Sequence, residues 1–361
     1  MGDSKRIGIL TSGGDCAGLN AVLRAVVHRA AELGWTVLGI EHGTHGLMES
    51  PPAARALNLA DFDGSVMRRG GTILGSSNFG NPFAFPQLDG DDLDRSDEVI
   101  AGYRALGLDA LIGIGGDGSL SILNKLAQKG DLNLVCIPKT IDNDVGVTEL
   151  SVGYDTAVQV ATDALDMLQP TAASHDRVMI LEVMGRDAGH IALVAGIAGG
   201  ADVILIPEIP YRIEHVVRKI RRVQKAGRRF ALVMVAEAVP NESGNKIVQK
   251  YAGGRSAYSG IGHLLGDRLA ETTRAEVRVT VLGDVQRGAA PDARDRLMAS
   301  VFGVHAVDLI AEGQFGRVVV WRDRQVLDLP IEEVVSEPAL VDLDGPVVRT
   351  ARGLGICLGD A

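Results

Sequence analysis

The chain has few cysteines and no excess of positive charge. Its 361 residues include three cysteines, Cys16, Cys136 and Cys357, which are too few for a disulfide framework and lack the spacing of a metal site. The 46 acidic residues outnumber the 36 lysines and arginines and give a formal net charge of −10. A nucleic-acid binder would normally present a basic face, so we expect no nucleic-acid partner. Local arginines could still bind a small anionic substrate.

Long apolar runs are also absent. The most apolar stretch, 191–209, is interrupted by three glycines, Asp202 and Pro207, so we expect no membrane-spanning helix. The first residues, Met-Gly-Asp-Ser-Lys-Arg, lead into a strand pattern without an apolar signal region, so we expect a cytoplasmic protein. The eight histidines have no HxH or HxxxH spacing, and we assign none of them to a metal.

Apolar runs rich in β-formers alternate with helical patterns in two series, before and after roughly residue 155. The first series predicts strands at 6–11, 36–40, 110–114 and 132–137, with helices at 19–33 and 121–128. The second predicts strands at 177–183, 203–206 and 230–235, with helices at 188–196 and 213–226. Such alternation predicts parallel sheets covered on both faces. We therefore expect an α/β protein with two doubly wound parallel-sheet lobes.

The segment PKTIDND, residues 138–144, follows one of the predicted buried strands. Open α/β sheets bind their ligands at the carboxyl ends of strands, where this segment lies. Two carboxylates, Asp142 and Asp144, together with Lys139, could hold Mg²⁺, orient a hydroxyl and neutralise phosphate charge. The pair would point to opposite sides of an extended chain, but both could line one site if the loop turns. The alternative is that Asp142, Asn143 and Asp144 only form an Asx-type turn.

Two glycine-rich loops occupy other strand-to-helix junctions. TSGGD at 11–15 could bring backbone N–H groups close to an anion, and its alternative is a tight turn. In GIGGDGS at 113–119, Asp117 could reach Mg²⁺, and Ser119 could cap the helix while binding a phosphate. The alternative is that Asp117 or Ser119 is only a helix cap. GGDG also occurs in NAD and lipid kinases, so this loop predicts nucleotide chemistry without naming the acceptor.

The second series carries its own polar groups near predicted strand ends. Arg186 lies in VMGRDAG at 183–189, Glu237 ends the strand at 230–235, and Arg278, Asp284 and Arg287 surround the run at 277–282. A guanidinium fork suits phosphate. We expect these arginines to share one edge of the sheet and bind an anionic substrate. The alternative is a set of solvated surface arginines.

In this order, the motifs resemble the phosphofructokinase family over nearly the whole chain. The matching segments are TSGGD at 11–15, GGTILGS at 70–76, GGDGS at 115–119, PKTIDND at 138–144, VMGRDAG at 183–189, VAE at 235–237 and VLGDVQRG at 281–288. The resemblance implies two α/β lobes with the active site in the cleft between them, in a homodimer or homotetramer that shares its active sites across subunits. It also implies transfer of a phosphoryl group from ATP or pyrophosphate to the 1-hydroxyl of fructose 6-phosphate, a glycolytic step.

The resemblance further implies roles for single residues. Residues 1–153 with about 287–335 would form the donor lobe, and 154–286 with the C-terminal segment the acceptor lobe. Asp142 would be the base, supported by Asp144, Thr140 and Lys139, and Arg186 would stabilise the transferring group. Donor-phosphate contacts would come from Gly14, Gly118 and Ser119, with Asp117 as the Mg²⁺ residue. The substrate-binding residues would be Thr140, Asp142, Met184, Gly185, Arg186, Glu237, Asp284 and Arg287, with Arg177 and Arg278 from a neighbouring subunit.

The donor and the acceptor depend on individual positions. Pyrophosphate-using relatives share Lys139 but carry an aspartate in place of Gly118, which would repel an ATP phosphate, so we expect ATP. Asp284 stands where the family commonly has a histidine that binds the sugar phosphate. Asn78 and Phe79 stand where relatives usually have a basic residue. These departures leave two alternatives to fructose 6-phosphate kinase activity: the same chemistry on another sugar, sugar phosphate or polyol, or a catalytically weak regulatory paralogue.

Overall fold

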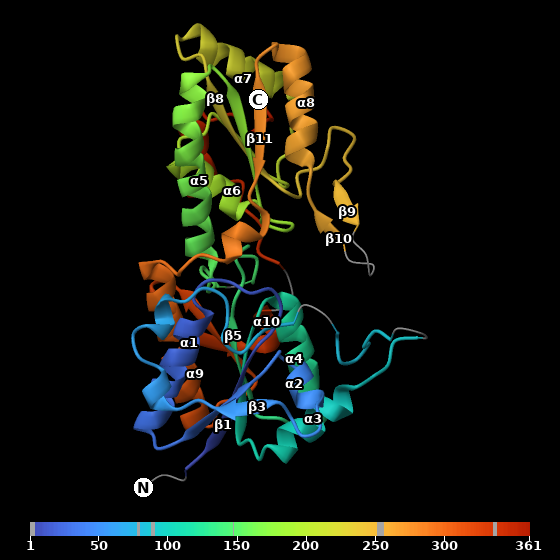
Figure 1. The fold of residues 1–361 in the computed structure, drawn as a ribbon, viewed down its shortest axis with the longest axis vertical. Coiled ribbons are helices and arrows are strands. Elements are labelled where there is room, and N and C mark those ends of the chain that lie inside the picture. Colours follow the sequence, from blue (N-terminus) through green and yellow to red (C-terminus); the bar gives the residue numbers. More distant parts are fainter. Residues whose placement is uncertain (1–3, 78–79, 88–90, 147, 251–255, 335–337) are drawn as a thin grey trace. The chain divides into compact units, whose positions relative to one another are not determined.

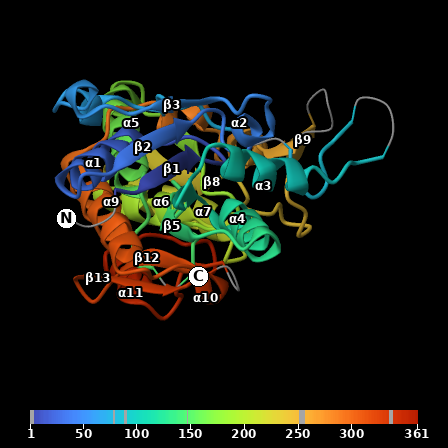
Figure 2. The ribbon, with the colours of Figure 1, turned by 90° about the horizontal axis from the view of Figure 1, so that it is seen from below.

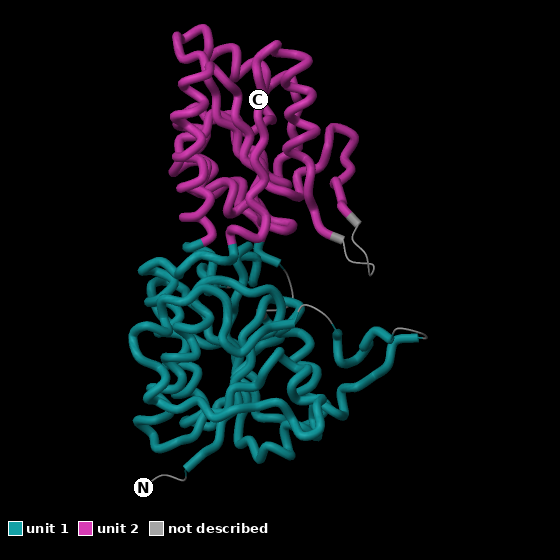
Figure 3. Tube along the Cα trace, viewed as in Figure 1, with its two compact units in different colours: residues 1–156, 287–339 teal, residues 157–286, 340–361 magenta. Residues whose placement is uncertain are grey.

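The computed structural model describes residues 4–77, 80–87, 91–146, 148–250, 256–334 and 338–361. The chain forms two compact units, coloured separately in Figure 3. Unit 1 comprises residues 1–156 and 287–339, and unit 2 comprises residues 157–286 and 340–361. Each unit is built from two separate chain segments.

Unit 1 contains a seven-stranded sheet in the order β13-β12-β5-β4-β1-β2-β3. Figure 2 shows this succession from β3 and β2 through β1 and β5 to β12 and β13. The central strands pair in parallel, and the edge pairs β2–β3 and β12–β13 are antiparallel. β4 and β5 are buried along their whole length, which explains their nearly continuous apolar sequences. The strands are β1 (Arg6–Thr11), β2 (Thr36–Ile40), β3 (Ala54–Ala56), β4 (Ala110–Gly115), β5 (Leu134–Pro138), β12 (Arg317–Arg322) and β13 (Gln325–Pro330).

Helices cover both faces of this sheet. α1 and α9 pack against each other on one face, and α3 and α4 lie together on the other (Figure 1). A mainly apolar cluster that includes Leu120, Leu123 and Cys136 joins α4 to the sheet. The helices are α1 (Leu19–Glu32), α2 (His45–Met48), α3 (Ser96–Ala105), α4 (Asp117–Gly130), α9 (Ala293–Ala311) and α10 (Ile331–Val334), with short 3₁₀ turns η1 (Leu59–Asp61) and η2 (Val66–Arg68).

Unit 2 contains a four-stranded, fully parallel sheet in the order β11-β6-β8-β7. α7 and α8 pack together, with α8 against β6 and β11, while α6 packs against β7 and β8. Its strands are β6 (Val178–Val183), β7 (Val203–Leu205), β8 (Ala231–Ala236) and β11 (Val277–Val281), with a small hairpin of β9 (Val248–Lys250) and β10 (Ser256–Tyr258). Its helices are α5 (Tyr154–Ser174), whose first three residues belong to unit 1, α6 (His190–Ala198), α7 (Ile213–Lys225), α8 (Ile261–Thr273) and α11 (Pro346–Gly353), and the turn η3 (Gly283–Arg287) crosses the unit boundary.

The α/β fold class expected from the sequence is confirmed, and most strand pairs are parallel. The two antiparallel edges of unit 1 were not expected. Their strands are partly exposed, so they lack the fully apolar sequence of buried parallel strands. No helix in the described part of the chain is long and apolar enough to cross a membrane.

Candidate functional site

Three sequence segments of unit 1 meet at the point where the strand order of its sheet reverses. β1 has β2 on one side and β4 on the other, and β5 follows β4. Ser12 N donates to Ile114 O at 2.9 Å, and Lys139 N donates to Gly115 O at 2.9 Å. The two glycine loops and PKTIDND therefore leave three adjacent strands at the same edge. Open α/β sheets place their ligands at such a switch point.

The first glycine loop is held in place by two cations. The ammonium of Lys139 donates to the carbonyl of Gly14, and Arg287 Nη1 donates to Asp15 O at 3.1 Å. A Cβ on residue 14 would lie 2.8 Å from Arg287 Nη1, so a side chain there would displace the guanidinium. A side chain at residue 14 would therefore require Arg287 to move, and Arg287 lies with the donor-loop residues of unit 1.

Lys139 is almost fully buried, with 4% of its surface exposed. Burial lowers the pKa of its ammonium, the nearby Arg287 lowers it further, and Cys16, Asp142 and Asp15 oppose the shift. Burial also raises the pKa of the Cys16 thiol, to about 12, so this cysteine stays protonated beneath the loop. The buried amine of Lys139 and the half-buried guanidinium of Arg287 thus lie against residues 14 and 15.

The second glycine loop becomes helix earlier than the sequence predicted. α4 begins at Asp117 and its N-cap is Gly116, with no side-chain cap hydrogen bond. The interpretation of Asp117 or Ser119 as the helix cap is therefore wrong, because both lie inside the first turn. The first N–H groups of a helix have no partner within it and favour anions. Gly118 is exposed, and a Cβ added there would meet nothing within 4 Å, so open space adjoins this turn.

Asp142 and Asp144 lie in a buried, sharply turned loop, with 7% and 6% of their surfaces exposed. The hydroxyl of Thr140 accepts from Asp142 N at 3.1 Å and donates to Asp142 Oδ2 at 3.5 Å. Asp144 is fixed through its carbonyl, which accepts from Ala339 N at 2.8 Å. The sequence allowed an Asx-type turn made by an aspartate, but here the Thr140 side chain makes the equivalent turn. The Thr140 hydroxyl also orients the Asp142 carboxylate.

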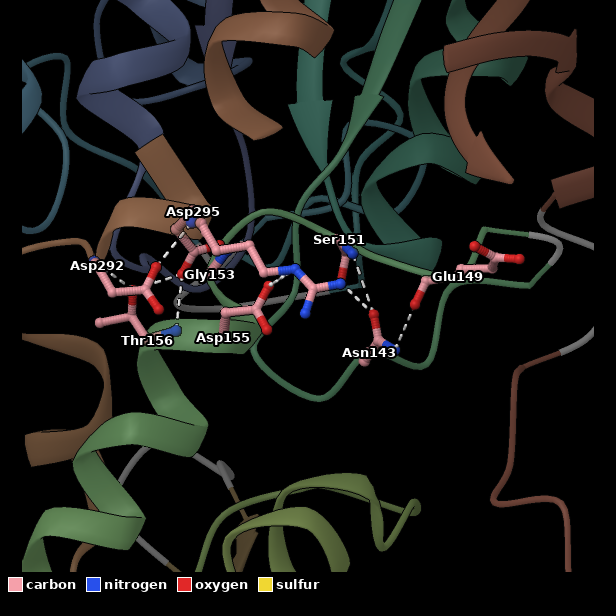
Figure 4. Close-up of polar contacts among 9 residues, drawn as sticks. Asn143, Glu149, Ser151, Gly153, Asp155, Thr156, Asp292 and Asp295 are labelled. Atoms are coloured by element: carbon pink, nitrogen blue, oxygen red, sulfur yellow. Dashed lines mark hydrogen bonds and ion pairs between the residues drawn. The ribbon is translucent and has the colours of Figure 1, made fainter. Parts of the chain in front are cut away.

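Asn143 fixes the conformation between the two carboxylates. Its φ of 52° lies in the left-handed region, which turns the chain and removes the alternation of an extended segment. Its Oδ1 accepts from Ser151 N at 3.0 Å and from Ser151 Oγ at 3.1 Å, and its Nδ2 donates to Glu149 O at 3.1 Å. Figure 4 shows the Asn143 side chain directed toward these two residues. Asn143 therefore joins the two ends of the loop that carries Asp142 and Asp144.

A buried carboxylate holds the next stretch of chain. Asp295 in the first turn of α9 accepts from Gly153 N and Thr156 N, both at 2.8 Å, and from the Thr156 hydroxyl (Figure 4). Asp292, the N-cap of the same helix, accepts from Asp295 N at 2.7 Å. Burial raises the pKa of Asp295 to about 6, although its hydrogen bonds oppose the shift. This carboxylate ties α9 to the segment that ends the PKTIDND loop.

Unit 2 brings a second set of predicted residues together at the carboxyl ends of β6 and β8. Glu237 Oε1 accepts from Arg186 N at 2.9 Å and Gly185 N at 3.3 Å. Met184 N donates to Gln286 Oε1 at 2.7 Å, and the Gln286 side chain is buried. Arg186 is exposed and has a φ of 50°. Asp284 is also exposed, at the start of η3.

Arg177 and Arg278 lie at the opposite edge of the same sheet. Arg278 in β11 pairs with Met179 at the amino end of β6, and Arg177 precedes β6. Both guanidiniums contact Glu276 Oε1, at 2.9 Å from Arg177 and 2.5 Å from Arg278. The six residues of β6 span roughly 20 Å between these arginines and Gly185. The expectation that Arg278 and Arg186 share one edge of the sheet is therefore wrong within one chain.

Three positioning residues were missed from the sequence: Asn143, Gln286 and Asp295. Asn143 had a local signal, because asparagine tolerates the left-handed region better than most residues. The partners of Gln286 and Asp295 are more than 100 residues away, so no local pattern could reveal them. Asn78 and Phe79, where the sequence departs from the expected basic residue, lie outside the described residues.

Comparisons with known proteins agree with the motif order. A family model described as Phosphofructokinase matches residues 6–310. An ATP-dependent 6-phosphofructokinase 1 of Synechocystis sp. is 62% identical over 361 residues, covering 100% of both chains. A protein of the same name from Nostoc sp. is 56% identical over 360 residues, again covering 100% of both. The crystal structure of Pichia pastoris phosphofructokinase in the T-state superposes with a TM-score of 0.81 at 29% identity; the match covers 99% of this chain but 37% of that one.

Proposed function

Because the chain belongs to the phosphofructokinase family, we propose that it is an ATP-dependent 6-phosphofructokinase. It transfers a phosphoryl group from ATP to the 1-hydroxyl of fructose 6-phosphate and gives fructose 1,6-bisphosphate, a step of glycolysis. The observation that carries the proposal is the meeting of PKTIDND with both glycine loops at the switch point of one sheet. That arrangement combines a base, cations and phosphate-binding N–H groups.

The donor phosphates bind at the glycine loop around Gly14 and at the start of α4. Gly118 and Ser119 offer N–H groups in the first helical turn, where a helix favours negative charge. The open space beside Gly118 accommodates the α-phosphate of ATP. Lys139 and Arg287 fix the loop carbonyls and supply positive charge beneath it. Lys139 is equally compatible with pyrophosphate, so the choice of ATP rests on Gly118 and on the names of the relatives.

Asp142 is the base that accepts the proton of the attacking hydroxyl. Thr140 orients its carboxylate, and Asp144 supports the same loop. As the oxygen attacks the γ-phosphorus and the bond to ADP breaks, Arg186 stabilises negative charge on the transferring group. Met184, Gly185 and Glu237 bind the sugar phosphate, and Asp284 adjoins it. Glu237 also keeps the Gly185–Arg186 backbone in place.

Mg²⁺ is the cofactor, held by Asp117. No group of three or more metal-ligating side chains occurs among the residues that the structure describes. The single carboxylate of Asp117 fits Mg²⁺, which is usually held by one or two carboxylates together with substrate phosphates. Asp117 is half-buried at the start of α4, beside the proposed phosphate site. When bound, the ion neutralises charge on the β- and γ-phosphates.

The active enzyme is a cytoplasmic homo-oligomer, a dimer or tetramer, with sites shared across subunits. Arg177 and Arg278 are about one strand length from Gly185 in their own chain, so they complete the site of a neighbouring subunit. Glu276 offsets one of the two positive charges of these arginines. Arg278 is exposed and Arg177 is half-buried, and we expect both to face a second copy.

A donor-by-acceptor activity matrix tests the proposal. ATP and pyrophosphate are each combined with fructose 6-phosphate, unphosphorylated fructose and other sugars, with Mg²⁺ present, and product is measured by a coupled assay. We expect turnover with ATP and fructose 6-phosphate. A preference for a neutral acceptor would favour the alternative in which Asp284 accepts a hydroxyl hydrogen bond, and no turnover with any pair would favour the regulatory paralogue.

Asp142→Asn is the matched test of the base. We expect kcat to fall by about 10²–10⁴-fold while the melting temperature stays close to wild type, because the amide keeps the shape but cannot accept the proton. Asp131→Asn is the control, since Asp131 is exposed at the C-cap of α4 and its left-handed backbone suits asparagine. Near wild-type turnover by Asp142→Asn would show that another group is the base.

A further inference from the structure

The region around α7 concentrates positive charge in an acidic protein. Residues 212–229 contain eight of the chain's 36 lysines and arginines and a single carboxylate, Glu214. Arg218, Arg222 and Lys225 lie on one side of the helix at spacings of four and three residues, where like charges repel. Arg222 and Lys225 in the last turn also complement the helix dipole, but Arg218 lies too far from that end. The helix dipole therefore does not offset the repulsion between Arg218 and the other two cations.

An open groove lies along this charged side. Its volume is about 710 Å³, and it runs between α7 and the carboxyl end of α8. Buried Ile213 and Val217 contribute to its lining. The groove is lined by Ile213, Glu214, Val217, Arg218, Arg221, Arg222, Lys225 and Thr272. This volume lies within the range of small-molecule sites, roughly 300–1,000 Å³.

The cations of the groove differ in how they are engaged. Arg221 Nη2 donates to Thr272 O at 2.8 Å and so helps to hold α7 against α8. The neighbouring cations outside the groove are also bound: Arg228 pairs with Asp202, and Arg229 pairs with Asp176 at 3.4 Å. By contrast, Arg218, Arg222 and Lys225 make no side-chain hydrogen bond or ion pair with any residue that the structure describes. Three exposed cations therefore converge on one groove, whose lining contains a single carboxylate, Glu214.

We propose that the α7–α8 groove binds a small polyphosphate anion, at a site separate from the proposed donor-phosphate loops of unit 1. Arg218 and Arg222 supply planar guanidinium forks that match phosphate oxygens, and Lys225 adds a point charge. Binding also relieves the repulsion among the three cations, so the anion stabilises the helix that holds it. Two or three phosphoryl groups supply oxygens for these three cations, and Glu214 in the same lining disfavours negative charge at the amino end of α7.

Calorimetric titration with inorganic tripolyphosphate tests the site. The full-length protein is compared with the variant Arg218→Gln/Arg222→Gln/Lys225→Gln and with the control Arg349→Gln/Lys125→Gln. Arg349 on α11 and Lys125 on α4 are exposed helical cations outside the groove. Among the saturable binding events of the wild type, we expect one that weakens at least about tenfold in the triple variant, is unchanged in the control, and weakens as salt is added. Binding to the loops of unit 1 is common to all three proteins and cancels in the comparison.

The readout is binding, so it does not depend on the proposed kinase activity. Without tripolyphosphate the triple variant should melt at or slightly above the wild-type temperature, because like charges have been removed. If the triple variant fails to fold, the single changes Arg218→Gln and Arg222→Gln should each weaken binding several-fold. Equal affinity in wild type and the folded variants, or non-saturable binding by wild type, would overturn the proposal.

Discussion

Asn143 shows how a residue without a reacting group can determine the geometry of those that have one. It lies between Asp142 and Asp144, and three side-chain hydrogen bonds connect it to Glu149 and Ser151. A substitution there would remove the hydrogen bonds that hold the turn between the two carboxylates. The donor loop, in contrast, is held by hydrogen bonds from Lys139 and Arg287. None of these hydrogen bonds involves Asn143.

Asn143→Ala should lower kcat by about tenfold or more and change the KM for ATP little. The alanine loses the three hydrogen bonds and tolerates the left-handed region less well than asparagine, and together these losses cost about 1–2 kcal/mol or more. Asn143→Gly separates the two effects, because glycine adopts this φ freely but restores no hydrogen bond. Steady-state kinetics on both variants is the measurement. Full activity of the glycine variant would show that backbone conformation alone positions the carboxylates.

Gly118→Asp should leave folding intact and reduce the use of ATP. The new Cβ meets no neighbour within 4 Å, so we expect an unchanged melting temperature. Its carboxylate would repel the donor α-phosphate and lower kcat/KM for ATP by about tenfold or more. Gly118→Ala is the control for side-chain volume, and kcat/KM is measured with both ATP and pyrophosphate. Equal loss in the alanine and aspartate variants would mean that space, not charge, selects the donor.

Among the elements, the contact between α9 and the start of α5 depends on one buried carboxylate. Asp295 is the acceptor for Gly153 and Thr156, and burial raises its pKa from 3.8 to about 6. Between about pH 4 and pH 6 the folded chain keeps a proton that the unfolded chain has released. The contribution of this group to the free energy of unfolding therefore falls as pH rises through that window and is constant above it.

Asp295→Asn should remove this pH dependence and lower stability. Both carboxylate oxygens accept hydrogen bonds, so the amide NH₂ would face a backbone N–H donor, at a cost of about 1–3 kcal/mol. Urea unfolding from pH 4 to pH 8 measures the difference between variant and wild type, with the exposed Asp323→Asn as control. Parallel pH profiles for wild type and Asp295→Asn would contradict the prediction.

The sequence predicted the buried parallel strands better than some of the helices that pack against them. β1 was expected at 6–11 and is found at Arg6–Thr11, because a buried parallel strand is almost wholly apolar. α9 was not predicted, since it contacts α1, β5 and β12 and so buries residues on several sides without one clear apolar face. Its carboxylate contact to Gly153 spans 142 positions. The motifs therefore predicted where the loops lie, but the residues that hold these loops in place come from distant segments.

At the scale of the whole molecule, the proposed sharing of sites predicts complementation between two inactive variants. Asp142→Asn and Arg278→Gln are each expected to be inactive as homo-oligomers. Co-expressed chains that mix at random as dimers should recover about a quarter of the wild-type sites, because a mixed dimer combines an intact Asp142 with the partner's intact Arg278. Activity per subunit in the purified mixture is the measurement. No recovery in verified mixed dimers would place Arg278 outside a shared site.

The division of unit 1 into two chain segments has a consequence for its synthesis. α9, β12 and β13 belong to unit 1 but lie after the whole first segment of unit 2. A ribosome that adds about 5–20 residues per second therefore completes residues 157–286 several seconds before the missing part of the first sheet emerges. Meanwhile β5 lacks its neighbour β12, Gly153 lacks Asp295 and the loop at Gly14 lacks Arg287. The nascent chain thus assembles its phosphate-binding loop only when translation is almost finished.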